Sequence, residues 1–522
     1  MTEKRNNFLD NVIEFVAPER AYRREAYRAL CEEMRQNYDA GGYGRVNNNW
    51  RVFNQTAEMT DRYDRDTVRA RARDLERNSD MMNSVISAYK RNVIGGGYTL
   101  QAMVEGNETL NKQIETAWKR WCRKQNCDIT KTQSLNQMLR MAVKRKKVDG
   151  GIIFIKCYSK GGIVPFKLQA VEVDELDSTH LQPHYSGNRV IGGVEVNSVS
   201  EPVGYWFRQI ANDGYTYLDP KFIPAKNVIT YWTKSRPTQI REMCDVAPTV
   251  TRIRDTNEFM TAVSVKERIA ACLSVFIKKQ IPTTGIGRNH AGSGNSFSYD
   301  GKTIAPGMIK ELNAGDEIQV VNPSGQSTDA AQFIKLQQRL IGAGQGLSYE
   351  ATSRDMSESN YSSARQGIIE DGETYTEDIE LVQELLDEIY ESFVISGVLC
   401  GLFVIPNFWE NKDNYFEHQW FKASKPWIDP VKESNANKIA LQTCQKTFKE
   451  ICAENGKDWR KQLEDTFEVL EYAKEKGYEI GGVILGQNEQ SIENVQKSDD
   501  DSQSEADGES DGKGSGENSA DE

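Results

Sequence analysis

Apolar residues recur every three or four positions in several stretches of this 522-residue chain, a pattern that predicts amphipathic helices. The first stripe, near the amino terminus, consists of Phe8, Leu9, Val12, Ile13 and Val16. A charged segment over 65–78 continues into an apolar run that ends at Gly95. The longest helix candidate spans 248–280, and Pro282 ends it.

Between residues 150 and 235 the period changes to two, and turn residues separate short apolar runs. No long helix stands between these runs, so we expect an antiparallel or mixed sheet rather than βαβ units. The predicted strands are 152–158, 164–173, 190–196, 205–207 and 228–232.

A second helix is predicted over 326–348, after a short β pattern near residues 318–321. The chain is then polar and rich in small residues from 349 to 365, which indicates a functional loop between two helices. A long acidic helix is predicted to follow over 367–393.

Two helices are predicted to close the folded part. The first uses Ala440, Cys444, Phe448 and Ile451. The second begins after Asp458, which can cap it, and ends at Gly477. From about residue 486 the chain is acidic, rich in Ser and Gly and nearly free of hydrophobic residues, so we expect disorder there.

The net charge of −12 is unevenly distributed. Residues 498–522 hold ten carboxylates and one lysine, a net of −9, which leaves about −3 for residues 1–497. The body of the protein is therefore nearly balanced, and the total charge does not argue against a nucleic-acid partner.

Two clusters of cations could contact phosphate. The arginine cluster at 65–77 includes three carboxylates, which favours a solvated or inter-subunit face over nucleic acid. For the run Lys144-Arg-Lys-Lys147, phosphate binding and a solvated helix end stay equally open.

Residues 392–409 carry no charge, but two glycines and a proline interrupt them and they barely reach spanning length. We interpret this stretch as buried core rather than a membrane helix. Nine cysteines are scattered without the paired spacing of a zinc site, and their odd number argues against a closed disulfide framework. Reduced thiols in a cytosolic assembly fit this pattern.

The sequence offers no convincing catalytic, cofactor-binding or metal-ligating arrangement. Gly301-Lys-Thr303 lacks the earlier glycine of a phosphate loop, because Ser296 stands at that position. His180 and His184 are four residues apart, but Pro183 between them spoils a helical metal face. We expect no enzyme activity, no cofactor and no metal.

Six motifs, in order along the chain, resemble the lambda-type portal proteins of tailed phages, and the similarity runs over roughly residues 20–475. They are Arg71-Ala-Arg-Asp-Leu75, Ser235-Arg-Pro-x-Gln239, Gly315-Asp-Glu-Ile318 with Asn322-Pro323, Gly346-Leu-Ser-Tyr-Glu350, Asn360-Tyr-Ser-Ser-Ala-Arg365 and Pro426-Trp-Ile-Asp-Pro430. Where that family has Asp-Gly-Glu, this chain has Asp149-Gly150-Gly151, which puts any role of that carboxylate in question.

The resemblance implies a mainly helical α+β ring subunit with wing, stem, clip and crown regions. The implied regions are the amino-terminal helices and β-rich wing (1–247), the first stem helix (248–280), the clip (281–325), the second stem helix (326–348), the tunnel loop (349–365), a long helix with the rest of the wing (366–430), the crown helices (431–485) and the disordered acidic tail (486–522).

Such proteins form dodecameric rings at one capsid vertex, conduct double-stranded DNA of any sequence during packaging and ejection, and join head to tail. The implied partners are the terminase large subunit, the major capsid and scaffold proteins, and the head-completion and tail connector proteins, with no membrane. The implied location is the portal vertex of the virion, after assembly in the cytoplasm of the bacterial host.

A channel through which DNA slides needs weak contacts, because each phosphate neutralised by a cation strengthens the binding of DNA to the protein. We expect the tunnel loop to approach DNA through Arg354, Asp355, Glu358 and Asn360. Asn360 can also cap a helix that begins at Tyr361, and both roles are compatible. The stem-lumen candidates are Lys335 and Arg339, and the terminase-facing clip candidates are Arg288, His290 and Lys302.

Other function classes stay open at this point. Another ring-forming tail or baseplate protein would share the assembly but is expected to be less helical. A DNA-processing packaging enzyme would need a phosphate loop or clustered acidic metal ligands. A membrane-associated protein would use residues 392–409 and depend on detergent for solubility.

Overall fold

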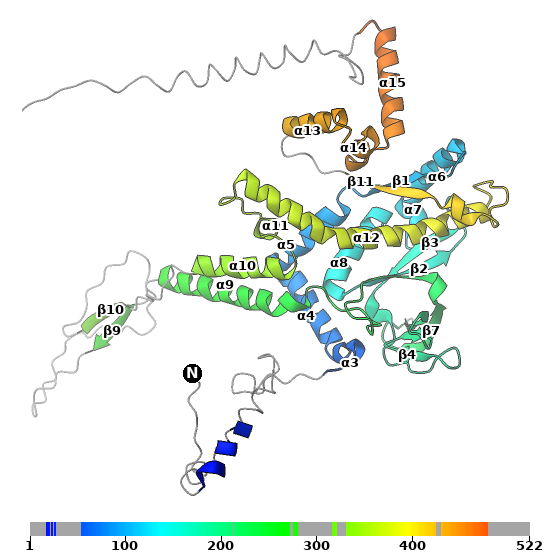
Figure 1. Ribbon diagram of the computed structural model, residues 1–522. Coiled ribbons are helices and arrows are strands. Elements are labelled where there is room, and N and C mark those ends of the chain that lie inside the picture. Colours follow the sequence, from blue (N-terminus) through cyan, green and yellow to red (C-terminus); the bar gives the residue numbers. More distant parts are fainter. Residues whose placement is uncertain are drawn as a thin grey trace, which may run out of the picture. The chain divides into compact units, whose positions relative to one another are not determined.

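The computed structural model (Figure 1) describes residues 54–211, 213–271, 275–279, 316–320, 330–423 and 430–478, with short pieces between residues 17 and 27. Helices predominate over strands, which confirms a mainly helical α+β protein. The predicted stripe at 8–16 and the acidic tail lie outside the described residues. The chain divides into two compact units, each of three segments. Unit 1 is Met1–Ile86, Lys144–Ile155 and Ala170–Gly367, and unit 2 is Ser87–Val143, Lys156–Gln169 and Ile368–Glu522.

Several elements belong to unit 1 alone. Its helices include α3 (Ala57–Asp61), α4 (Arg65–Asn78), α9 (Val250–Ala271), α10 (Ala330–Gly344) and α11 (Tyr349–Ser353). Its strands include β4 (Arg189–Ile191), β5 (Val194–Val196), β6 (Pro202–Ile210), β7 (Tyr217–Pro224), β8 (Val228–Tyr231), β9 (Val275–Lys279) and β10 (Asp316–Val320). The elements whose residues fall in both units are α5 (Asp80–Tyr89), α8 (Leu135–Asp149), β2 (Ile152–Tyr158), β3 (Phe166–Val171) and α12 (Tyr361–Leu399).

Strands β4-β5-β6-β7 form an antiparallel sheet, and the first half of β2 pairs antiparallel with β8, as expected from the absence of intervening helices. The strand predicted at 190–196 is instead a hairpin. Gly192 and Gly193 have φ of 56° and 84°, the conformation that a tight two-residue hairpin turn requires. Strand β7 was missed because it contains two prolines, which an edge strand tolerates.

The helix predicted over 248–280 is shorter than expected. It ends as α9 at Ala271, and β9 follows and pairs antiparallel with β10, with Val275 opposite Val320. The run Val275-Phe-Ile277 is β-branched and aromatic, so the strand is locally favoured once a partner strand exists. The predicted strand near 318 is confirmed, and α10 lies beside α9 (Figure 1). The ring centroids of Phe259 on α9 and Phe333 on α10 are 4.7 Å apart.

Two arginines of α4 are buried, so the expectation of a solvated or inter-subunit face is wrong for them. Arg69 Nη2 lies 2.7 Å from Oε1 of Glu242, and the two side chains are 2% and 0% exposed. Arg65 donates from Nε to the carbonyl oxygen of Glu242 and pairs with Glu58 at 2.8 Å. Burial would raise the pKa of Glu242, but the charges of Arg241 and Arg69 hold it below its usual range.

The basic run 144–147 neither forms a solvated helix end nor presents free cations. The last two lysines are buried, and each Nζ lies 3.0 Å from Oδ2 of Asp245. The first two cations both pair with Glu76 of α4. The run therefore binds α8 to its surroundings within unit 1.

Asp149, which agrees with the Asp-Gly-Glu pattern that Gly151 breaks, has a clear structural role. Its buried carboxylate accepts from Arg73 Nε at 2.7 Å and from Arg145 Nη1 at 3.0 Å. Gly150 follows with φ of 92°, and a Cβ there would lie 2.6 Å from the carbonyl carbon of Met243. Only glycine fits this close approach of two chain segments.

Unit 2 is organised around an aromatic core. Trp121 is fully buried, stacks on Phe166 with ring centroids 5.4 Å apart, and donates from Nε1 to the carbonyl oxygen of Phe166 at 3.0 Å. Trp118 contacts Tyr390 and Phe393 of α12 edge to face. The elements within this unit are β1 (Tyr98–Ala102), α6 (Glu108–Trp121), α7 (Lys124–Cys127), β11 (His418–Lys422), α13 (Pro430–Gln442), α14 (Phe448–Glu454) and α15 (Trp459–Glu475).

The uncharged stretch 392–409 is only partly core. Phe393 and Phe408 are buried, whereas Leu399 and Val404 are exposed, because α12 ends at Leu399 and the chain turns back. Among the described residues, no helix combines the length and apolar character that a membrane crossing needs.

The carboxy-terminal stripe at 440–451 is divided between two helices. Thr447 starts α14 with a capping box, since its Oγ1 accepts from the amide of Glu450 and the Glu450 carboxylate accepts from the amide of Thr447. The boundaries of the last helix are confirmed: Asp458 caps α15, and Gly477, with φ of 75°, follows its end.

Candidate functional site

The polar segment of the sequence lies between α10 and α12, in unit 1. Ser348 begins α11, because its Oγ accepts from the amide of Ala351 at 3.2 Å. The hydroxyl of Ser84, on α5, donates to the carbonyl oxygen of Thr352, and Thr352 itself is buried. The chain that leads into the loop is therefore held at both ends of α11.

The loop is shorter than the predicted 349–365, and it spans only residues 354–360. Arg354 adopts the left-handed conformation, with φ of 59°, and ends α11. Asn360 begins α12, because its Oδ1 accepts from the amide of Ser363 at 2.8 Å, which confirms the capping role. Both flanks are helical because polar side chains satisfy the first amides of each helix. We call residues 354–360 the α11–α12 loop.

Two cations of α10 face this loop and share one of its carboxylates. Lys335 and Arg339 both form ion pairs with Glu358, the second at 3.7 Å. Both also lie over the ring of Tyr349, at 5.4 and 5.5 Å from its centroid. One carboxylate and one aromatic face thus hold both cations.

Asp355 is tied to the same group. Its carboxylate accepts from the amide of Ser357 at 3.0 Å and from the hydroxyl of Tyr349 at 3.3 Å. Hydrogen bonds from Ser357, together with that of Tyr349 and the charge of Lys335, hold the pKa of Asp355 below its usual range. These hydrogen bonds therefore favour the charged form of the Asp355 carboxylate.

The predicted residues separate into two groups. Lys335, Arg339 and Glu358 come together directly, and Asp355 joins them through Tyr349. Arg354 and Asn360 stand at the two ends of the loop and are exposed.

Within the described part of the chain, Arg354 forms no ion pair, so it is the loop's uncompensated charge. Arg288, His290 and Lys302 lie outside the described residues. Tyr349 was not predicted as a site residue, although it belongs to a quoted motif. Its position as the first residue of a short helix gave no hint that two cations lie over its ring.

Residues 43–378 match the family described as phage portal protein, lambda family. A probable portal protein of Halomonas phage phiHAP-1 is 25% identical over 433 residues, covering 79% of this chain and 82% of that protein. Portal protein B of Escherichia phage lambda is 20% identical over 451 residues, covering 76% of this chain and 83% of that protein.

A chain from the solved virion of a native gene transfer agent particle is similar in structure, with a TM-score of 0.42 and 10% identity. The match covers 75% of this chain and 93% of that one.

Proposed function

Because this chain belongs to the lambda family of phage portal proteins, we propose that copies of it form a ring at one capsid vertex, where the head joins the tail. Double-stranded DNA would pass through the ring inward during packaging and outward during ejection. The ring would dock the terminase large subunit during packaging and would contact capsid, scaffold and head-completion proteins. The role is structural, with no catalytic step assigned to the chain.

The elements can be assigned to the regions of such a subunit. In this assignment α9 and α10 are the stem helices, and β9 and β10 belong to the clip. The sheet that contains β4 to β7 belongs to the wing, and α13 to α15 form the crown. The α11–α12 loop is then the tunnel loop that lies nearest the DNA.

The pairing of Lys335 and Arg339 with Glu358 is the observation that carries this proposal. A cation in a ring is repeated in every subunit, and each one that binds a phosphate would add a salt-dependent grip on the strand. With the charges of Lys335 and Arg339 balanced by those of Glu358 and Asp355, the loop would offer one exposed arginine, Arg354, among polar and acidic neighbours. Such a surface favours weak contacts without sequence preference, as a conduit requires.

The test replaces Arg354 with alanine in an otherwise intact phage or in a packaging system with purified components. We expect a shorter packaged genome or poorer retention of DNA. Rings of Arg354→Ala protein, viewed by electron microscopy, should keep the shape and subunit number of the unmodified rings. Normal packaging and retention by this variant would show that Arg354 does not contact DNA in the channel. Failure of the purified unmodified protein to form rings with its assembly partners would contradict the portal role.

A further inference from the structure

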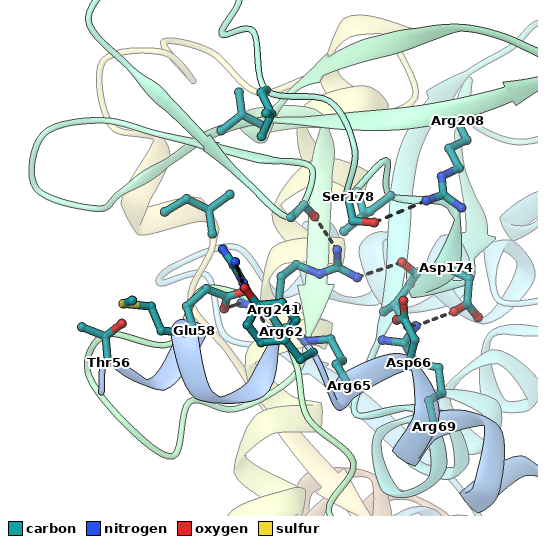
Figure 2. A pocket seen from close by; sticks show the side chains of 18 residues that line it. Thr56, Glu58, Arg62, Arg65, Asp66, Arg69, Asp174, Ser178, Arg208 and Arg241 are labelled. Atoms are coloured by element: carbon teal, nitrogen blue, oxygen red, sulfur yellow. Dashed lines mark hydrogen bonds and ion pairs between the residues drawn. The ribbon is translucent and has the colours of Figure 1, made fainter. Parts of the chain in front are cut away.

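A cavity of about 540 Å³ lies within unit 1, between α3, α4 and the segments that carry Asp174, Gly192 and Arg208 (Figure 2). Five arginines and three carboxylates line it, so its charged wall carries an excess of positive charge. None of the residues of the α11–α12 loop takes part. The cavity is therefore separate from the proposed DNA contact.

Three of the five arginines are fully engaged with groups of the fold. Arg241 and Arg69 bind the buried carboxylate of Glu242, and Arg65 binds Glu58. These ion pairs are buried and form part of the folded structure, so they do not supply charge to a ligand.

The other two arginines have weaker partners. The guanidinium carbon of Arg62 lies 4.3 Å from the ring centroid of its neighbour Tyr63, and Arg62 donates from Nη2 to the Tyr63 hydroxyl. It forms no ion pair with any residue that the structure describes. Arg208 donates to Ser178 at 3.3 Å, and its Nε is 3.6 Å from Asp177 (Figure 2). Both guanidinium groups keep donors with which they could bind a carboxylate.

The edge of the cavity is apolar as well as charged. Met59, Tyr63 and Leu181 line it and are 52%, 71% and 74% exposed. Large exposed apolar side chains around a charged recess are typical of a site for a protein segment. The occupant should then combine two carboxylates with several apolar side chains.

Residues 8–16 of the same chain have this composition. The segment Phe8-Leu-Asp-Asn-Val-Ile-Glu-Phe-Val16 carries two charges, Asp10 and Glu14, both negative and at the four-residue spacing that would share one face of the helix predicted from the sequence. Six of its other seven side chains are apolar. The tail at 498–522 is more acidic but contains no large apolar residue, so it would leave the exposed edge uncovered.

The chain also enters the described part of the structure at this cavity. Thr56 lines it, Arg236 binds the carbonyl oxygen of Gln55 at 2.8 Å, and the amide of Ala57 donates to Thr238 at 3.0 Å. Residues 17–55, about 40 residues, connect the segment to this point, enough to reach the cavity even at the rise of a helix. A covalent link of this length raises the local concentration of the segment at the cavity.

We propose that residues 8–16 dock in this cavity, with Asp10 and Glu14 on Arg62 and Arg208 and the apolar side chains on Met59, Tyr63 and Leu181. The segment comes from the same copy or from a neighbouring copy of this chain. This docking is independent of whether the α11–α12 loop contacts DNA.

The test uses the full-length protein with Ile13→p-benzoylphenylalanine, a photoreactive residue, and locates the cross-links by mass spectrometry. We expect cross-links to residues 56–66, 173–192 and 208. The pair Asp10→Arg with Glu14→Arg should lower their yield about five- to twentyfold, the effect of two partly exposed ion pairs. The pair Arg62→Glu with Arg208→Glu should do the same, and combining all four should restore the yield. Glu3→Arg, outside the segment, is the matched control and should change nothing.

Cross-links that map to another surface, or a yield that charge reversal leaves unchanged, would overturn the proposal. So would photoreactive groups in the tail at 498–522 that label this cavity in place of residue 13. Because Asp10 and Glu14 are outside the described fold, their variants keep the test decisive even if the arginine variants lose stability. Mixing isotopically labelled and unlabelled protein distinguishes a segment of the same copy from one of a neighbour, and either source supports docking.

Discussion

The imidazole of His418 on β11 lies with Nε2 2.9 Å from Oδ1 of Asp387 on α12, and its Nδ1 faces the carbonyl oxygen of Phe416. Both neighbours are hydrogen-bond acceptors, so both ring nitrogens donate only when the ring is protonated. Burial would lower the pKa of His418, but the hydrogen bonds to Asp387 and Phe416 outweigh it and raise that pKa above its usual value. The same pair lowers the pKa of Asp387 against the opposing effect of burial.

These shifts predict a pH-dependent stabilisation of unit 2. A raised histidine pKa contributes stability that is complete below the pKa of the unfolded chain, about 6.5, and is lost as the pH rises through the folded value. Asp387 is 47% exposed, so solvent screens the pair and we expect His418→Asn to cost only about 1 kcal/mol at pH 6. Thermal unfolding between pH 5 and 9 should show that the difference in unfolding temperature between the unmodified protein and His418→Asn narrows as the pH rises. A difference that widens with pH would contradict the assignment.

Glu358→Gln should make the α11–α12 loop more cationic, because Lys335 and Arg339 lose their shared carboxylate. We expect purified rings of this variant to bind double-stranded DNA more tightly at low salt and to lose that affinity more steeply between 50 and 200 mM salt. Filter binding over this range measures both effects. Glu377→Gln, an exposed position on α12, is the matched control. Equal salt dependence in both variants would show that the loop does not meet DNA.

Gly150→Ala should prevent unit 1 from folding normally. The new Cβ would lie 2.6 Å from backbone of Met243, at a φ that disfavours side chains. We expect a loss above about 3 kcal/mol and little soluble protein. Gly106→Ala isolates the conformational part, because Gly106 also has positive φ but nothing stands within 4 Å of its Cβ position, and it should cost about 1 kcal/mol. Comparable soluble yields of the two variants would refute the steric account.

Trp121→Ala should be among the most damaging core changes in unit 2. It removes a fully buried ring that stacks on Phe166, so the expected loss is about 3–5 kcal/mol. Trp121→Phe keeps most of the volume but leaves the carbonyl oxygen of Phe166 without its donor, so the expected loss of unfolding free energy is about 1–2 kcal/mol. Trp409→Ala, at a 61% exposed position, serves as control and should shift the urea unfolding curve by much less. The order of the three midpoints checks the prediction.

The helical pattern of the sequence predicted most helices, since apolar periodicity and local caps such as Asp458 act within a few residues. Elements that depend on distant partners were predicted poorly. Strand β1 was missed because its partner β11 lies more than 300 residues away, with Tyr98 opposite Lys422. The helix predicted through 280 ends early because residues 275–279 instead form β9, which pairs with the distant strand β10.

In the candidate site too, local features could be predicted and features that depend on distant residues could not. The position of the loop, and the cap at Asn360, could be predicted from its composition. The compensation of Lys335 by Glu358 could not, because it depends on how α10 and the loop meet. For the same reason Arg69 was expected at the surface, although Glu242, 173 residues later, holds it in the interior.

Strand β1 is translated long before β11, the strand with which it pairs. At about 5–20 residues per second, roughly 15–60 s separate the emergence of the two strands from the ribosome. During that interval β1 is without its partner strand, and the aromatic side chains of α6 lack the residues of α12 that later cover them. Unit 2 can be completed only after residues 418–422 have been made, so a chain that stops between residues 368 and 417 would contain all three segments of unit 1 but would leave β1 without its partner strand.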